Sequence, residues 1–129
     1  MDRNPLISCA AGHLGAAAFT ALFSAVYEHF GHGVWSAYMI FAFAIPLLLG
    51  ALPAFILLNA KKEAPPSVSV KLWNCGIASF TVGSLFQGVL EIYGTTNRLI
   101  IVYPVVGAVL TSAAVVTRIS TACRARSRR

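Results

Sequence analysis

Apolar residues are gathered into four long runs that short polar stretches separate. Three of the runs contain no charged residue, and the fourth contains only His32 as a candidate for charge. An α-helix needs about 20 residues to cross about 30 Å of hydrocarbon. The pattern therefore predicts four membrane-spanning helices, which cover residues of about 6–28, 35–59, 72–92 and 99–118.

Turn-forming residues agree with these boundaries. Gly31 and Gly33 lie between the first two runs, the Pro65-Pro66 pair precedes the third, and Gly94 precedes the fourth. Three further prolines lie inside the runs, where each removes a backbone donor and crowds the preceding turn. Kinks are therefore expected at Pro46, Pro53 and Pro104.

Composition excludes most other classes of protein. Hydrophobic residues make up 57% of the 129 residues and charged residues only 11%, whereas a soluble domain is about 25% charged. The chain is too apolar for a soluble globule, a disordered chain or a secreted disulfide-rich protein. Its three cysteines show no metal-ligand spacing. We expect residues 1–129 to form a single integral membrane domain, typical of a small bacterial multi-span protein.

Lysine and arginine are distributed unevenly between the two predicted sides of the membrane. Nine of the ten fall in the N-terminus, the loop after the second run or the tail, and only Arg98 falls on the other side. The positive-inside rule then places both termini in the cytoplasm, with a basic tail at 119–129. The expected surroundings are the lipid bilayer of the cell membrane. Nucleic-acid binding is not expected from so short a basic tail.

The chain resembles itself at an offset of 63 residues. Residues 22–31 overlay residues 85–94 with five identities in ten, including the pairs Glu28/Glu91 and Gly31/Gly94. Only four acidic residues exist in the chain, so the glutamate match is the informative one. We therefore predict an all-α, four-transmembrane-helix bundle of two helical hairpins related by an axis along the membrane normal. The first and third spans are expected at its centre.

The same offset aligns small and hydroxyl residues at a four-residue spacing. Such a row lies on one helix face, with a drift of about 40° per step. It predicts a tight packing seam between helices. A second interpretation is a polar track that leads to the two acids and is made of Thr20, Ser24, Ser79 and Gln87.

Candidate chemistry gathers at the predicted outer ends. Glu28 and Glu91 would face each other there, with His29 and His32 nearby. Two close carboxylates at low dielectric cannot both ionise cheaply, so one is expected to hold a proton or a cation. The four residues are a candidate proton or cation site, and a divalent metal is a possible cofactor. The alternative is that both acids are solvated at the headgroup level.

His13 is the one histidine predicted inside a span. It is interpreted either as a proton-relay group or as a neutral imidazole hydrogen-bonded to a neighbouring helix. The sequence contains no nucleotide-binding or hydrolase motif.

Three functions are compatible with this sequence. The first is a transport or channel module for a small cation or proton. The second is an accessory or scaffolding subunit of a larger membrane complex, or a homo-oligomer. The third is a metal-dependent intramembrane enzyme, which the short loops make the weakest of the three.

Overall fold

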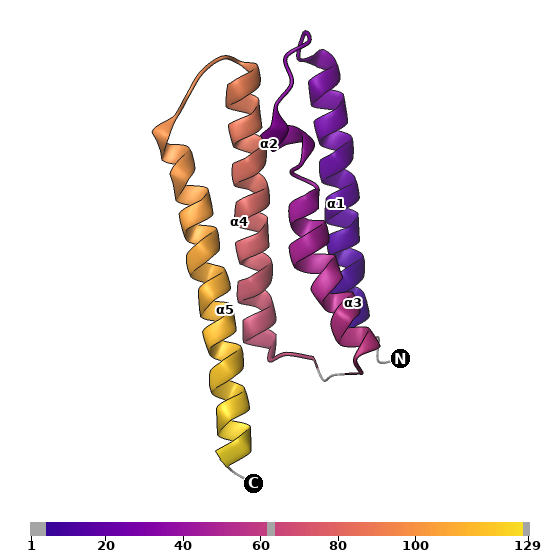
Figure 1. The fold of residues 1–129 in the computed structure, drawn as a ribbon, viewed down its shortest axis with the longest axis vertical. Helices are drawn as coiled ribbons and strands as arrows, with labels where there is room; N and C mark the ends of the chain where they lie inside the picture. The colour runs from indigo at the N-terminus through magenta and orange to yellow at the C-terminus, as the bar shows by residue number, and fades with distance from the viewer. Residues whose placement is uncertain (1–4, 62–63, 128–129) are drawn as a thin grey trace.

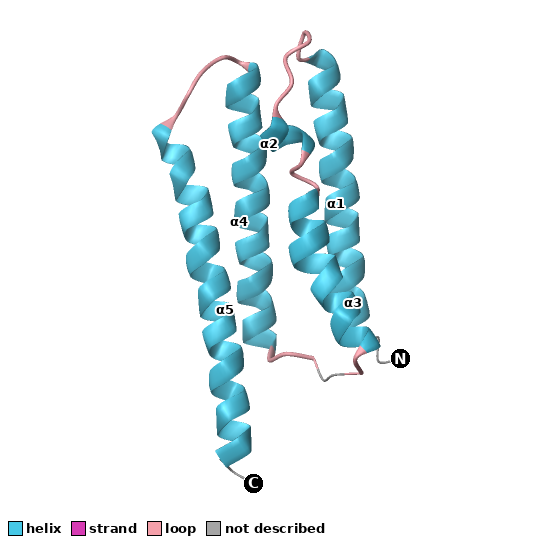
Figure 2. Cartoon of the chain, in the orientation of Figure 1, coloured by secondary structure: helices cyan, strands magenta, loops and turns pink. Residues whose placement is uncertain are grey.

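The computed structural model describes residues 5–61 and 64–127, and these residues form helices joined by turns (Figures 1 and 2). The elements in chain order are α1 (Pro5–Phe30), α2 (Ala37–Ile40), the π-helix η1 (Pro46–Ala51), α3 (Leu52–Asn59), α4 (Ser67–Ile92), the 3-10 helix η2 (Arg98–Ile101) and α5 (Val102–Ser127). The all-helical prediction is confirmed for this part of the chain. The basic tail continues α5 as helix as far as Ser127.

Three helices of the described chain are long and apolar enough to cross a membrane. They are Pro5–Phe30, Ser67–Ile92 and the continuous stretch Arg98–Ser127. The remaining apolar helix, Pro46–Asn59, is shorter. The chain is therefore of a membrane-protein type. The second predicted span, at about 35–59, is interrupted at residues 41–43, and the count of four spans stays a prediction.

Two prolines account for the form of the second segment. After α2 the chain turns through residues 41–43, and the helix that follows passes into π form at Pro46. Pro46 and Pro53 have no N–H to give to the carbonyls of Ala42 and Leu49, four residues earlier, and their rings crowd that turn. The Leu49 carbonyl instead accepts the indole N–H of Trp73 at 2.8 Å. Pro104 has less effect, because it lies in the first turn of α5 directly after η2.

The short elements α2 and η1 lie between α1 and α4, and α3 packs on α1. α1 packs mainly on η1 and α3, while α4 packs on α5, α2 and η1 (Figure 1). The first and third spans were expected at the centre of the bundle. α4 does have neighbours on both sides, whereas α1 packs on the second segment, whose residues Gly50 and Ala51 are buried.

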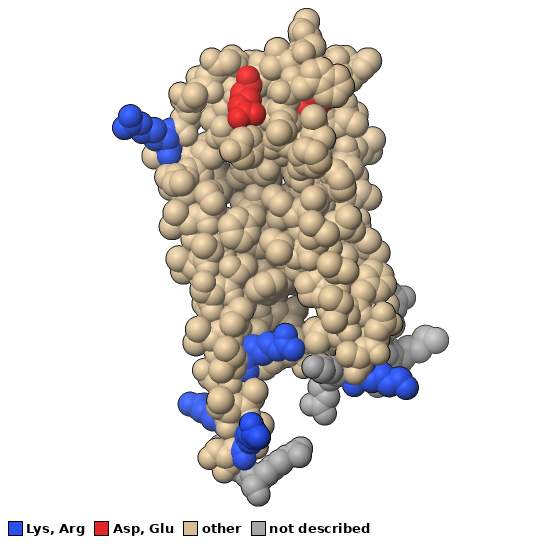
Figure 3. All heavy atoms as spheres, viewed as in Figure 1, with Lys and Arg blue, Asp and Glu red and all other residues tan. Residues whose placement is uncertain are grey.

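Charge separates along the long axis of the molecule. The two ends of the chain lie at the same end, and Lys and Arg gather there, while Glu side chains lie at the opposite end (Figures 1 and 3). Arg98, in η2, is the described basic residue at the acidic end. We call the basic end the inner end and the acidic end the outer end.

The two hairpins of the proposed repeat end differently. α1 and α4 both run from the inner end to the outer end (Figure 1). After α4 the chain turns at Gly94, with φ +68°, but after α1 the positive φ values belong to His32 and Gly33 rather than Gly31. The matched glycines therefore do not serve the same backbone role, and the repeat stays a prediction.

A glycine-to-alanine pair tests the packing of α2 against α4. A Cβ on Gly88 would lie 2.8 Å from Met39 Cβ and 2.9 Å from Met39 N, and the backbone atom cannot yield without moving α2. Gly88→Ala should lower the free energy of unfolding in detergent by about 1–3 kcal/mol. Gly12→Ala is the control, because a Cβ there meets nothing within 4 Å. It should be neutral or stabilising, and equal effects of the two variants would contradict the packing described.

Candidate functional site

Ser36 joins the two outer glutamates. Its backbone N–H donates to Glu28 Oε1 at 2.9 Å, and its hydroxyl donates to Glu91 Oε2 at 2.6 Å. Glu28 lies in the last turn of α1 and Glu91 in the last turn of α4, whereas Ser36 precedes α2. Ser36 is fully buried. The structure therefore brings the two carboxylates to one buried serine.

The short helix α2 holds Ser36 in place, and serines on both neighbouring helices hold α2. Ser24 of α1 donates to the Met39 carbonyl at 2.7 Å, and Ser84 of α4 donates to the Tyr38 carbonyl at 2.7 Å. The Ser36 hydroxyl also accepts the Met39 N–H at 3.4 Å, which caps the helix. A displacement of α2 would break hydrogen bonds to both long helices at once.

Glu28 has an incomplete hydrogen-bond set. Its Oε1 accepts from Ser36, but its Oε2 is buried without a hydrogen-bond partner. Glu91 is better satisfied, because its Oε1 accepts from Gln87 Nε2 at 3.4 Å and its side chain is more exposed. An ionised carboxylate oxygen that is buried and unpaired costs free energy, and a proton or a cation removes that cost.

The two outer histidines do not join the carboxylates. His29 is exposed and packs edge-on against Phe30, with ring centroids 5.4 Å apart. His32 is exposed and lies in the turn after α1. Across residues 5–61 and 64–127, no three His, Cys, Asp or Glu side chains gather as metal ligands. Of the four residues predicted for this site, the structure brings together Glu28 and Glu91 and leaves His29 and His32 apart from them.

The predicted polar track is divided between different neighbours. Ser24 and Gln87 belong to the outer cluster described above. Thr20 instead donates to the Ala16 carbonyl of its own helix at 2.7 Å, and Ser79 donates to the Tyr103 carbonyl of α5 at 2.8 Å. Residues at a four-residue spacing drift around the helix axis. The members of the predicted track near the outer end therefore face α2, whereas Thr20 and Ser79 bond to other backbone carbonyls.

His13 is bonded to a neighbouring long helix. Its Nε2 lies 3.0 Å from Asn74 Oδ1, and Nε2 is the donor because an amide oxygen only accepts. Cys9 Sγ lies 4.0 Å from the same oxygen. The ring packs so closely on η1 that a Cβ on Gly50 would overlap it. This hydrogen bond ties α1 to α4.

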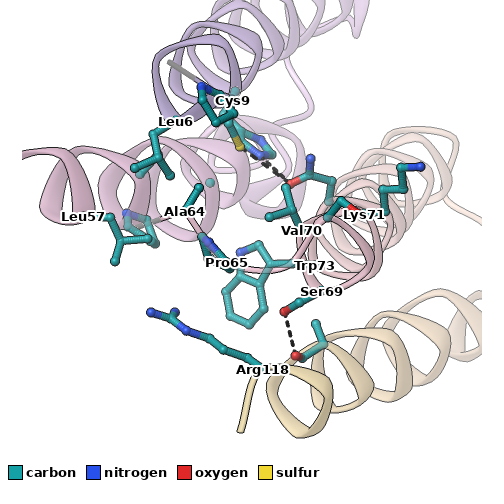
Figure 4. A pocket seen from close by; sticks show the side chains of 18 of the residues that line it. Leu6, Cys9, Leu57, Ala64, Pro65, Ser69, Val70, Lys71, Trp73 and Arg118 are labelled. Carbon is teal, nitrogen blue, oxygen red and sulfur yellow. Dashed lines mark hydrogen bonds between the residues drawn. The ribbon is translucent and has the colours of Figure 1, made fainter. Parts of the chain in front are cut away.

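Two hollows flank this framework. One, of about 600 Å³, lies at the inner end, has His13 among its lining residues, and is bordered by α1, α3, α4 and α5 (Figure 4). The other, of about 880 Å³, lies toward the outer end between η1, α4 and η2. Gln87 and Arg98 both line the outer hollow. Because Gln87 also bonds to Glu91, this hollow lies next to Glu91, on the side of α4 that faces α5.

Sequence reasoning missed Ser36 and Ser84. Serine is a common membrane-helix residue, and neither has a counterpart in the 63-residue repeat. The one available signal was that Ser36 precedes a potential helix as an N-cap residue.

Comparison with protein-family models, curated proteins and solved structures finds no match to this chain. Its fold and charge distribution define its class. It is an all-helical protein of the membrane type, and its candidate site is defined by the contacts of Glu28 and Glu91 with Ser36.

Replacement of Ser36 by alanine tests the joining of the two carboxylates. Ser36→Ala removes the hydroxyl that donates to Glu91 and caps α2, so the free energy of unfolding should fall by about 1–3 kcal/mol. Ser120→Ala is the control, because that exposed serine bonds only to the carbonyl of Val116 in its own helix. The control should change stability by less than about 0.5 kcal/mol. Chemical unfolding followed by circular dichroism measures both, and an Ser36→Ala effect no larger than the control would contradict the role of Ser36.

Proposed function

We propose that the protein is a transport or channel module for a proton or a small cation, with Glu28 and Glu91 as its outer binding site. The observation that carries the proposal is the shared contact of both carboxylates with Ser36, next to the buried and unpaired Glu28 Oε2. Ionisable groups at membrane depth are costly and are usually functional. A proton is the simplest occupant, because it neutralises the carboxylate without the several oxygen ligands that a metal ion needs.

The interrupted second segment supports this proposal. Transporters commonly use discontinuous helices at their binding sites, because freed backbone groups and half-helices can change partners. Met39 and Ala42, three and six residues after Ser36, are fully buried. Passage of an ion past these packed residues would require a movement of α2 relative to α4.

The proposed orientation places the basic inner end in the cytoplasm of a cell membrane. Lys and Arg at that end would be retained by the positive-inside effect, and the acidic site would face outward. The outer hollow lined by Gln87 would then give water access to the site from the non-cytoplasmic side.

Isosteric replacement of the two acids tests the site. Glutamine keeps an oxygen that accepts from Ser36, so Glu28→Gln and Glu91→Gln should preserve the fold while removing the ionisable group. In proteoliposomes, the double variant should reduce proton or cation flux to the rate of protein-free liposomes. Assays across pH and with added divalent metal separate a proton from a metal ion.

Two controls accompany the flux assay. Glu28→Asp retains a carboxylate and should retain part of the flux. Arg124→Gln changes one exposed charge in the last part of α5, away from the pair, and should retain most of it. A double glutamine variant that matches the wild type under every condition would refute the proposal.

Membrane orientation is tested by labelling single cysteines in intact cells. The first variant keeps only Cys123, and the second carries only Thr96→Cys, with native cysteines replaced by alanine. Both positions are exposed. An impermeant maleimide should label position 96 directly and Cys123 only after the membrane is opened. The reverse pattern would contradict the orientation.

A second candidate function is an accessory subunit of a larger membrane complex. Its support is the exposure of α5, which packs mainly on α4 and has 11% of its most apolar stretch buried, against 28% for α1. Native mass spectrometry in mild detergent should then show a stoichiometric partner. A protein that is stable without a partner and conducts ions would favour the first proposal. A homo-oligomer would mean that other copies of this chain cover α5.

A further inference from the structure

The cavity at the inner end has features of a ligand site that the outer carboxylates do not explain. Its volume of about 600 Å³ falls within the range of small-molecule sites. Four helices border it, and the space-filling view is hollowed at this end, where basic side chains border the recess (Figure 3). It is distinct from the outer site, so the inference below is independent of the proposed function.

The walls of the cavity are mainly apolar. Leu6 and Leu57 line one side, and Val70 lines the other (Figure 4). Val115 of α5 also lines the cavity. The polar groups at its deep end, His13 and Asn74, bond to each other at 3.0 Å. Ser69 is satisfied as well, since its hydroxyl donates to the Ala114 carbonyl at 2.8 Å. Such walls match a hydrocarbon chain rather than a polar solute.

The mouth of the cavity is basic. Arg118 is the first charged residue after the apolar run of α5, and its guanidinium extends from α5 toward the side where Leu57 lies (Figure 4). The Lys71 side chain points away from the cavity on the other side of α4 (Figure 4). Among the described lining residues none is acidic. The other two acids of the chain, Asp2 and Glu63, lie outside the described residues.

We infer that this cavity binds an anionic amphiphile, with its acyl chain between the apolar walls and its carboxylate or phosphate head at Arg118. A guanidinium binds both head groups through paired hydrogen bonds. The position of Arg118 at the end of an apolar run is that of the inner headgroup level. The ligand is either a free fatty acid or an anionic phospholipid of the surrounding leaflet, and both present the same chemistry.

Binding of a ligand in the cavity can be measured through the fluorescence of Trp73, because this side chain lines the cavity. The chain has two tryptophans, so Trp35→Phe leaves Trp73 as the single fluorophore. This protein in phosphatidylcholine nanodiscs would receive dibromostearate, brominated phosphatidic acid or brominated phosphatidylcholine as separate probes. Bromine quenches tryptophan on contact. Half-maximal quenching of Trp73 should need about fivefold less of an anionic probe than of the phosphatidylcholine probe.

Variants at the mouth of the cavity test whether Arg118 causes the preference for anionic over neutral probes. Arg118→Gln should bring the ratio between anionic and neutral probes close to one, and Arg118→Lys should retain part of it. Lys71→Gln is the matched control, because it removes the same charge from a side chain that points away, and it should keep the wild-type ratio. Circular dichroism of each variant checks that the helix content is retained.

A competition assay in the protein that retains Arg118 tests the inference even if an Arg118 variant fails to fold. Oleate or unbrominated phosphatidic acid should reverse the quenching, and added phosphatidylcholine should not. Preference for the free acid alone or for the phospholipid alone supports the inference and identifies the source of the ligand. Equal quenching by all three probes, or an unchanged ratio in Arg118→Gln, would overturn it.

Discussion

The fold depends on how the interrupted second segment satisfies its backbone polar groups. Inside a membrane, an unpaired carbonyl has no water to bond with, so irregular backbone persists only where other protein groups replace the missing partners. Three side chains do this here. Ser24 and Ser84 donate to the carbonyls of α2, and Trp73 donates to the Leu49 carbonyl opposite Pro53. These bonds connect the second segment to α1 and α4 and keep it between them.

The same constraint creates the outer site. Because α2 is a short turn that begins at Ser36, a backbone N–H and a hydroxyl are available at one buried point. Both glutamates bond to these two groups, one from each long helix. The inner cavity is a consequence of the same bend, since η1 and α3 lean on α1 while α5 packs on α4.

Sequence reasoning identified Glu28, Glu91 and His13 as the residues to examine, and it placed both acids at one end. It paired the acids with His29 and His32 because those residues are close in sequence. The structure separates them, since the chain turns away after Phe30 and leaves both histidines exposed. His13 was expected to bond to a neighbouring helix as one alternative, but its pairing with Asn74 depends on a close approach of the ring that Gly50 permits.

The sequence alone determined the helical class, the apolar lengths of α1, α4 and α5, and the separation of basic and acidic ends, because each depends on residues that are near one another in the chain. It also located the prolines that disturb the second segment. Only the tertiary structure decided the arrangement of the helices and the identity of the groups that meet at Ser36 and in the inner cavity. Those outcomes depend on hydrogen-bond partners that are far apart in sequence, such as Ser36 with Glu91, 55 positions apart, and His13 with Asn74, 61 positions apart. No local pattern of hydrophobicity encodes such distant pairs.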